Sequence, residues 1–229
     1  MTTHFKNFSD VGAELVKRQN FSAANTSKRP YRDRFKRMFD IAFVIAAAPI
    51  AIPMIGIMLL LTALDGGLPF YRQRRIGKDG RLYNMMKMRT MVVDADQRLE
   101  AHLEANPEAR AEWDSTQKLK DDPRITKIGK FLRKSSMDEL PQLWNVLMGD
   151  MSIVGPRPMM EDQKSLYPGT AYYAMRPGIT GPWQVSDRNE STFAQRATFD
   201  NKYYHDLSLK TDLGILGKTF GVVLRCTGH

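Results

Sequence analysis

The sequence predicts an α+β fold that is mainly helical. It combines a re-entrant membrane helix-hairpin, amphipathic interfacial helices, a small β-hairpin and one compact cytoplasmic domain. Three observations lead to this prediction: an uncharged stretch interrupted by prolines, a Gly-Lys-Asp-Gly turn between two short apolar and aromatic runs, and apolar residues at helical spacing further along. A chain of 229 residues has room for one domain with its own core and some appendages.

The charge balance predicts a polyanionic partner. The chain has 34 Lys and Arg against 25 Asp and Glu, a formal net charge of +9. Nucleic acid, anionic lipid and phosphorylated substrates all fit such a charge. The single cysteine, Cys226, excludes an intramolecular disulfide and a thiolate metal cluster, which fits a reducing compartment.

The uncharged stretch from Ile41 to Leu64 predicts a membrane segment. At ~1.5 Å per residue a helix of this length crosses a ~30 Å hydrocarbon core. Pro49 and Pro53 lie in its middle, and basic clusters flank both ends, which favours keeping both ends on the cytoplasmic side. A re-entrant hairpin that bends at the prolines satisfies both flanks. A proline-kinked span and a buried core helix are the alternatives.

Residues 68–91 predict a β-hairpin around the turn Gly77-Lys78-Asp79-Gly80. Phe70-Tyr71 and Leu82-Tyr83 are expected on its paired strands. Lys87 follows on the second strand, where its ammonium is either a solvated charge or a ligand for a pyrophosphate.

Two helical regions follow the hairpin. Residues 94–122 are rich in Ala and Glu with near-balanced charge, and predict a solvated helical insertion that breaks at Asn106-Pro107. Asp122-Pro123 then starts a basic amphipathic helix, which ends near Arg133. Such a helix fits an anionic membrane surface, although a nucleic-acid-binding helix has the same pattern.

Two adjacent acids, Asp138 and Glu139, mark the start of the next predicted helix. Pro141 is tolerated in the first turn of a helix, so the helix begins close to Asp138. Apolar residues then recur at the spacing of one buried helix face: Leu140, Leu143, Trp144, Leu147 and Met148. On structural grounds alone, Asp138 caps the helix and Glu139 complements its dipole, each contributing roughly 0.5–1 kcal/mol.

The neighbours of these acids favour a second interpretation. Arg133 precedes them, and Gly155-Pro156-Arg157-Pro158 follows them. Carboxylates beside cations at a helix start suit phosphoryl transfer. Further along, the segment from Arg176 to Val185 alternates turn residues with a short apolar piece and predicts a rigid, ligand-binding loop. Two helices are expected after it, at 193–204 and 213–224.

From Phe35 to about Val223 the sequence resembles the bacterial sugar transferases, the monotopic phosphoglycosyl transferases that begin lipid-linked glycan assembly. The resemblance rests on FKRMFD before the membrane stretch, YNMMKMRTM, the block DPRITKIGKFLRKSSMDELPQLWNVLMGDMSIVGPRP, RPGITGPWQV and YYHDLSLKTDL. It implies that a sugar 1-phosphate moves from a UDP-sugar to undecaprenyl phosphate, with release of UMP and use of Mg²⁺. The insertion resembles that of exopolysaccharide-type members, which favours galactose or glucose as the sugar.

The resemblance also implies roles for individual residues. Asp138 is the expected nucleophile that forms a covalent phosphosugar intermediate, and Glu139 assists it or, with Asp138, holds the metal. The remaining candidates bind phosphate or nucleotide sugar: Lys87, Arg133, Arg157, Arg176 and Gln184.

The expected organisation is a loosely ordered tail (1–30), a basic approach with the membrane hairpin (31–67), and a catalytic domain (68–229) on the cytoplasmic face of the bacterial inner membrane. An anionic phospholipid surface is an expected partner, nucleic acid is not, and a homo-oligomer is compatible with the sequence. The alternative function is a basic membrane-associated scaffold subunit without catalysis.

Overall fold

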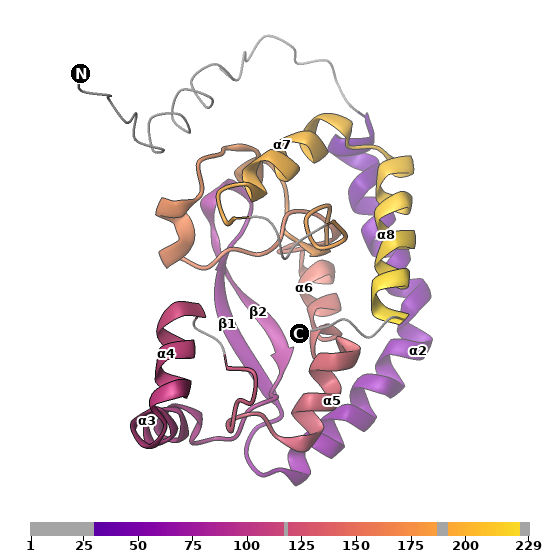
Figure 1. Ribbon diagram of the computed structural model, residues 1–229. Helices are drawn as coiled ribbons and strands as arrows, with labels where there is room; N and C mark the ends of the chain where they lie inside the picture. Colours follow the sequence, from indigo (N-terminus) through magenta and orange to yellow (C-terminus); the bar gives the residue numbers. More distant parts are fainter. Residues whose placement is uncertain (1–29, 117–118, 187–191, 225–229) are drawn as a thin grey trace, which may run out of the picture. The chain divides into compact units, whose positions relative to one another are not determined.

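The computed structural model describes residues 30–116, 119–186 and 192–224 (Figure 1). The α-helices are α2 (Lys36–Leu64), α3 (Ala95–Ala105), α4 (Pro107–Thr116), α5 (Lys127–Ser135), α6 (Gln142–Met148), α7 (Arg196–Asp206) and α8 (Leu209–Leu224). The strands are β1 (Phe70–Ile76), β2 (Leu82–Met88), β3 (Ser152–Val154) and β4 (Gly178–Thr180). The described chain is therefore mainly helical, as predicted, and has two small sheets, of which the β1–β2 hairpin was predicted. The predicted tail lies outside the described residues, except for Pro30.

The chain forms two compact units, and each is built from separate sequence segments. The first unit comprises Met1–Val44, Arg74–Asn84 and Asn145–Phe220, and the second comprises Ile45–Gln73, Met85–Trp144 and Gly221–His229. The predicted regions 31–67 and 68–229 each contribute to both units, so these limits stay a prediction.

Helix α2 contains the predicted membrane segment. By length and composition it is apolar enough to cross a membrane, and only 11% of its most apolar window is buried. This low burial argues against the core helix of a soluble domain. Helix α2 continues through Pro49 and Pro53, which are exposed, so the segment is not divided into two helices. Its return to the same membrane face stays a prediction.

The predicted hairpin is confirmed. Strands β1 and β2 pair, and their connection is a single 3₁₀ turn, Lys78–Gly80 (Figure 1). Asp79 and Gly80 adopt positive φ angles of 58° and 76°, the conformation that Asp tolerates and Gly favours. The turn residues in the sequence therefore identified this element through local backbone chemistry.

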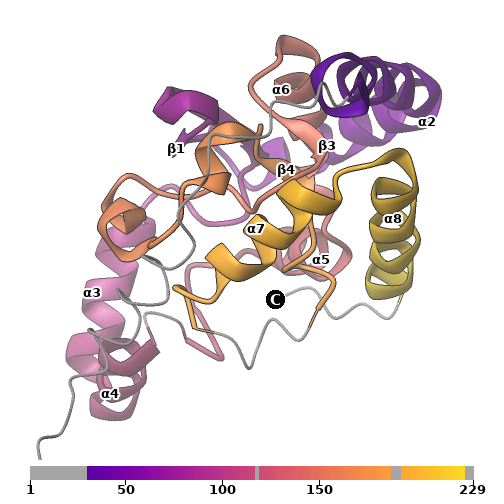
Figure 2. The same cartoon turned by 90° about the horizontal axis from the view of Figure 1, so that it is seen from above.

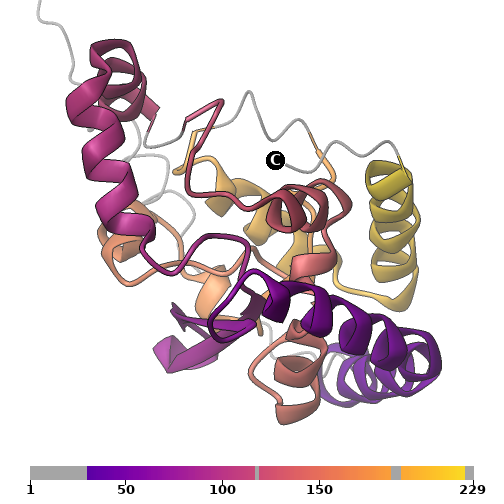
Figure 3. The ribbon, with the colours of Figure 1, turned by 90° about the horizontal axis from the view of Figure 1, so that it is seen from below.

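The predicted break at Asn106-Pro107 is also confirmed. Helix α3 ends at Ala105 and α4 begins at Pro107, and Figure 3 shows these two helices (magenta) changing direction between them. Residues 117–118 of this region lie outside the described residues.

The start of α5 differs from the prediction. Helix α5 begins at Lys127 rather than at Pro123, because the Thr126 hydroxyl accepts a hydrogen bond from Gly129 N at 2.9 Å and caps the helix. Asp122 is occupied elsewhere: it accepts hydrogen bonds from Arg124 N at 3.0 Å and Nη2 at 2.6 Å. The Asp-Pro pair therefore forms a turn before the helix.

The first unit contains a parallel strand pair that the sequence did not predict. Ser152 in β3 pairs with Gly178 in β4, and Val154 pairs with Thr180. Figure 2 shows α7 beside these strands, where the Tyr203 hydroxyl donates to Val154 O at 3.2 Å. The expected rigid loop after Arg176 is thus in part a strand.

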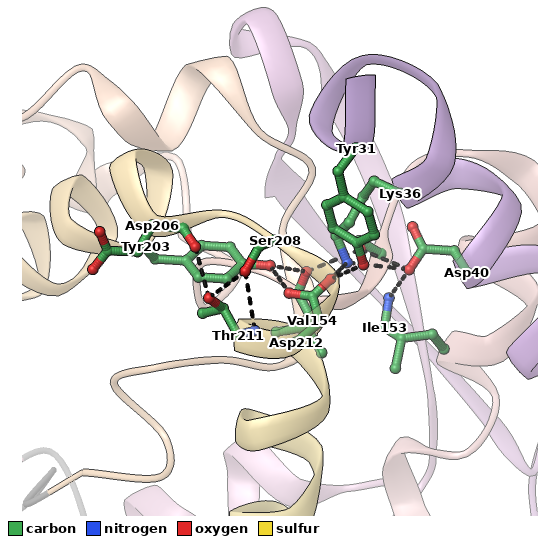
Figure 4. A network of polar contacts seen from close by, with 11 residues as sticks. Tyr31, Lys36, Asp40, Ile153, Val154, Tyr203, Asp206, Ser208, Thr211 and Asp212 are labelled. Atoms are coloured by element: carbon green, nitrogen blue, oxygen red, sulfur yellow. Dashed lines mark hydrogen bonds and ion pairs between the residues drawn. The ribbon is translucent and has the colours of Figure 1, made fainter. Parts of the chain in front are cut away.

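A buried ionic network joins the start of α2 to β3 and α8 within the first unit (Figure 4). Lys36 Nζ lies 3.4 Å from Asp40 Oδ1 and 2.9 Å from Asp212 Oδ2. Asp40 also accepts hydrogen bonds from the backbone N of Ile153 and the hydroxyl of Ser152. Both carboxylates are fully buried, so removing one partner would leave an uncompensated charge. The network fixes β3, which leads directly into the Gly155-Pro156-Arg157-Pro158 segment.

Candidate active site

The second unit brings together four of the predicted site residues. Helix α5 packs closely on the segment that follows β2, because Gly129 has no side chain. A Cβ there would lie 2.0 Å from Thr90 O. Thr126 N donates to the same carbonyl at 3.1 Å, and Arg133 Nε donates to the Thr90 hydroxyl at 2.9 Å. These contacts hold Arg133 of α5 against the chain that continues from β2, the strand that carries Lys87.

The two acids lie in a single 3₁₀ turn, Met137–Glu139, that precedes α6. Ser136 ends α5 with a left-handed backbone, φ 57°, and turns the chain. The prediction that the acids stand in the first turn of the helix is therefore wrong: α6 begins after Pro141. The N-cap residue of this turn is Ser136 and not Asp138, so the structure does not place Asp138 in the predicted capping position.

The predicted buried face of α6 is also wrong. Gln142, Asn145 and Val146 are buried, whereas Trp144 and Met148 are each 55% exposed. Asn145 Nδ2 donates to Asn84 O at 2.9 Å, and this bond accounts for its place inside. The apolar spacing identified an amphipathic helix, and polar contacts decided which of its sides is buried.

Glu139 and Asp138 differ in environment. Lys87 Nζ lies 2.7 Å from Glu139 Oε1, in a partly buried ion pair. The Asp138 side chain is buried, with 9% of the residue exposed. The pKa of Asp138 is raised to about 6, mainly by burial and also by the charge of Glu139, whereas Lys87 and Arg133 oppose this shift. The result is a desolvated carboxylate that is ionised at neutral pH, beside two cations and a second, paired carboxylate.

The donor chemistry of this pair fits Mg²⁺. Among the described residues, no group of three His, Cys, Asp or Glu side chains gathers as a metal site. Mg²⁺ commonly needs fewer protein ligands, because one or two carboxylates act together with water and substrate phosphates. Asp138 and Glu139 would supply such hard oxygen donors.

The other three predicted residues belong to the first unit. Arg157 is exposed, with its guanidinium carbon 5.5 Å from the centre of the Trp183 ring. Arg176 Nε donates to Gly149 O at 2.7 Å, and Gln184 Nε2 donates to Ile179 O at 3.0 Å. Arg157 lines a pocket that includes neither of the other two. The substrate-binding roles of these residues stay predictions.

Sequence reasoning missed several charged residues that the structure buries fully or in part. Asp40 and Asp212 lie within FKRMFD and YYHDLSLKTDL, and an acid inside an otherwise apolar or basic motif is a signal that could have identified them. Arg196 and Asp200 gave no comparable signal, because they lie on a helix of mixed composition.

Comparison with known proteins identifies the family. The family model described as bacterial sugar transferase matches residues 31–226. A UDP-galactose-lipid carrier transferase of Erwinia amylovora is 47% identical over 195 residues, which are 84% of this chain and 41% of that protein. The exopolysaccharide production protein ExoY of Sinorhizobium fredii is 45% identical over 203 residues, which are 87% of this chain and 90% of that protein.

A third relative is an undecaprenyl-phosphate galactose phosphotransferase of Salmonella typhimurium. It is 46% identical over 206 residues, which are 89% of this chain and 43% of that protein. The chain thus spans less than half the length of two of these relatives and most of the third. With a family model that covers most of its length, this chain is a transferase that belongs to the bacterial sugar transferase family.

Proposed function

We propose that this protein transfers a sugar 1-phosphate from a UDP-sugar to undecaprenyl phosphate and releases UMP. The reaction would be the first membrane step of exopolysaccharide assembly, on the cytoplasmic face of the bacterial inner membrane. The observation that carries the proposal is the buried Asp138 beside the Lys87–Glu139 ion pair, with Arg133 held nearby through Thr90. A scaffold subunit would have no need for a desolvated carboxylate among cations.

The chemistry follows from the two carboxylates. An oxygen of Asp138 attacks the phosphorus that carries the sugar, the bond from that phosphorus to the bridging oxygen breaks, and UMP leaves with the electron pair. A phosphate oxygen of undecaprenyl phosphate then attacks the same phosphorus and displaces Asp138. Two displacements thus replace one difficult reaction between two anions.

The neighbours of Asp138 have separate tasks in this proposal. Lys87 and Arg133 place positive charge where the transferred phosphoryl group carries negative charge. Glu139, held by Lys87, is a second oxygen donor next to the nucleophile. When bound by these two carboxylates, Mg²⁺ would neutralise the diphosphate and the departing UMP.

The names of two relatives point to one sugar. The Erwinia protein is named for UDP-galactose and a lipid carrier, and the Salmonella protein for undecaprenyl phosphate and galactose. Galactose is therefore the first sugar to test, and glucose the second.

The test is UMP release by the purified full-length chain in detergent or nanodiscs, with undecaprenyl phosphate, Mg²⁺ and a panel of UDP-sugars. We expect UMP to appear with one or two of the sugars. Multiple turnovers should require undecaprenyl phosphate. If no UDP-sugar releases UMP, the transferase proposal fails and the scaffold alternative is favoured.

The activity should fall on the acid side of about pH 6. Asp138 attacks only as a carboxylate, and burial raises its pKa to about 6. The value of kcat/KM should therefore be level above this pH and decrease about tenfold per pH unit below it. Rates of UMP release measured between pH 4.5 and 8.5 check this expectation.

Two variants should move the acid limb of the pH profile, which is the decrease in kcat/KM at low pH, in opposite directions. Lys87 lowers the pKa of Asp138 and Glu139 raises it, so Lys87→Met should shift the limb to higher pH and Glu139→Gln to lower pH. A limb that stays in place in both variants would assign it to another group.

The membrane segment should report both of its ends on the cytoplasmic side. In a Cys226→Ser background, cysteines are introduced as Arg34→Cys and Arg72→Cys, at exposed positions on either side of α2. An impermeant maleimide should label both sites only after the inner membrane is permeabilised, because the basic flanks disfavour translocation. Labelling of one site in intact spheroplasts would instead establish a helix that spans the membrane.

A further inference from the structure

The first unit contains a pocket whose function the proposed chemistry leaves open. Its lining residues are Arg157, Met159, Tyr167, Tyr172, Trp183, Phe193, Arg196 and Asp200. The empty volume is about 250 Å³ including the open solvent at its mouth.

Two arginines of this pocket lie against one indole ring. The guanidinium carbon of Arg196 is 4.1 Å from the centre of the Trp183 ring, and that of Arg157 is 5.5 Å from it. Arg196 also lies 4.5 Å from the centre of the Phe193 ring. These distances are those of cation–π contacts, in which the π face of a ring attracts a guanidinium group.

The pocket has an excess of positive charge. Among its described lining residues, Asp200 is the single acid, and the Tyr167 hydroxyl donates to it at 2.7 Å. Burial raises the pKa of Asp200 to about 7, so this acid is a weak counter-ion at neutral pH. Burial, and then the charge of Arg157, lower the pKa of Arg196 to about 10, and Arg75 adds to this repulsion. The charge of Asp200 opposes this shift without outweighing it, so the arginines repel one another when no anion is bound.

Arg196 also has a hydrogen-bond donor that is not used within the part of the protein that the structure describes. The Nε of Arg196 is buried and has no hydrogen-bond partner among the described residues. A buried donor without a partner costs free energy, which a bound acceptor would recover.

We propose that Arg157 and Arg196, with Trp183 behind them, form a binding site for a phosphate group. Guanidinium groups match phosphate oxygens in geometry and charge, and a bound phosphate would relieve the repulsion between the two arginines. Stacking of a nucleotide base is a poorer fit, because Arg196 lies over the Trp183 ring. The sequence predicted a phosphate-binding role for Arg157. The structure adds Arg196, the Trp183 ring against which both arginines lie, and Asp200 as a nearby acid.

Which molecule carries the bound phosphate group depends on the proposed function. In that reaction both the nucleotide and the lipid acceptor carry one, and the chemistry of the pocket is the same for either. The binding itself does not depend on turnover and is tested separately.

The experiment uses the full-length Asp138→Asn chain, which the mechanism makes inactive, with Trp113→Phe and Trp144→Phe so that Trp183 is the remaining tryptophan. Inorganic pyrophosphate is titrated at constant ionic strength, and Trp183 fluorescence reports binding. We expect a saturable change that Arg157→Gln and Arg196→Gln each weaken about tenfold or more in Kd.

The matched control is Arg74→Gln. Arg74 forms an exposed ion pair with Glu161 and does not line the pocket, so Kd should change less than about twofold. Arg157 is exposed, and its variant keeps the test valid even if Arg196→Gln folds poorly. Pyrophosphate binding that is unchanged in Arg157→Gln and in a folded Arg196→Gln would overturn the proposal, as would an equal response to potassium chloride.

Two further arms distinguish the sources. If the site binds the nucleotide, UMP should compete with pyrophosphate. If it binds the lipid acceptor, nanodiscs that contain undecaprenyl phosphate should change the Trp183 fluorescence. Either result supports a phosphate site. If UMP release fails in the functional assay while Arg157 and Arg196 still bind pyrophosphate, the site stands and only its proposed ligand changes.

Discussion

Asp138→Asn should reduce UMP release by at least about 10³-fold and remove any covalent phosphosugar adduct. The amide has nearly the shape of the carboxylate but lacks its negative charge, so the nucleophile is lost while the Lys87–Glu139 ion pair is kept. The measurement is a single-turnover reaction with labelled UDP-galactose, quenched in acid, with the adduct detected by intact-protein mass spectrometry.

Two controls separate loss of chemistry from loss of structure. Asp65→Asn makes the same chemical change at an exposed acid of the second unit, and Lys120→Ala removes an exposed charge from the helical insertion. Both should retain near-normal rates. An Asp138→Asn variant that turned over at a similar rate to these controls would exclude the covalent mechanism and leave a direct transfer between the two substrates.

Gly129→Ala should lower the free energy of unfolding by about 3 kcal/mol, near the upper end of the cost of overpacking. The added Cβ would lie 2.0 Å from Thr90 O and 2.7 Å from Thr90 C. These are backbone atoms that cannot rotate away, so α5 must move and the hydrogen bond from Arg133 to Thr90 is lost. Urea unfolding in detergent, followed by circular dichroism, measures the change, and UMP release should fall with it.

The control for this prediction is the same substitution in open space. Gly214 lies in α8, and a Cβ there would meet nothing within 4 Å. Gly214→Ala should leave stability unchanged or raise it by about 0.5–1 kcal/mol, because Ala favours a helix over Gly. If Gly129→Ala behaved in the same way, the close packing of α5 on Thr90 would be wrong.

Elements specified by local chemistry were predictable. The turn at Asp79 and Gly80 needs positive φ angles, and Asn106-Pro107 breaks a helix, whatever the rest of the chain does. The uncharged stretch that forms α2 was recognisable for a similar reason, since its composition alone fits a membrane core. Lys87, Arg133, Asp138 and Glu139 were identified because cations and acids recur within short, recognisable motifs.

Features that depend on distant contacts were not predictable in this way. The pairing of Ser152 with Gly178 joins two three-residue strands, which are too short to give an alternating pattern. The buried side of α6 was predicted wrongly, because Asn145 finds its partner in Asn84, far away in the sequence. Asp40 and Asp212 likewise become buried only when Lys36 lies between them.

The two acids at the candidate site illustrate the difference between what local sequence determines and what the tertiary structure determines. The sequence by itself determined that Asp138 and Glu139 stand side by side among cations, because adjacency and composition are local properties. Only the tertiary structure decided that they differ: Lys87 arrives from β2 to pair with Glu139, and the surrounding chain buries Asp138. Desolvation depends on which segments of the folded chain exclude water from a side chain, and no short stretch of sequence contains that information.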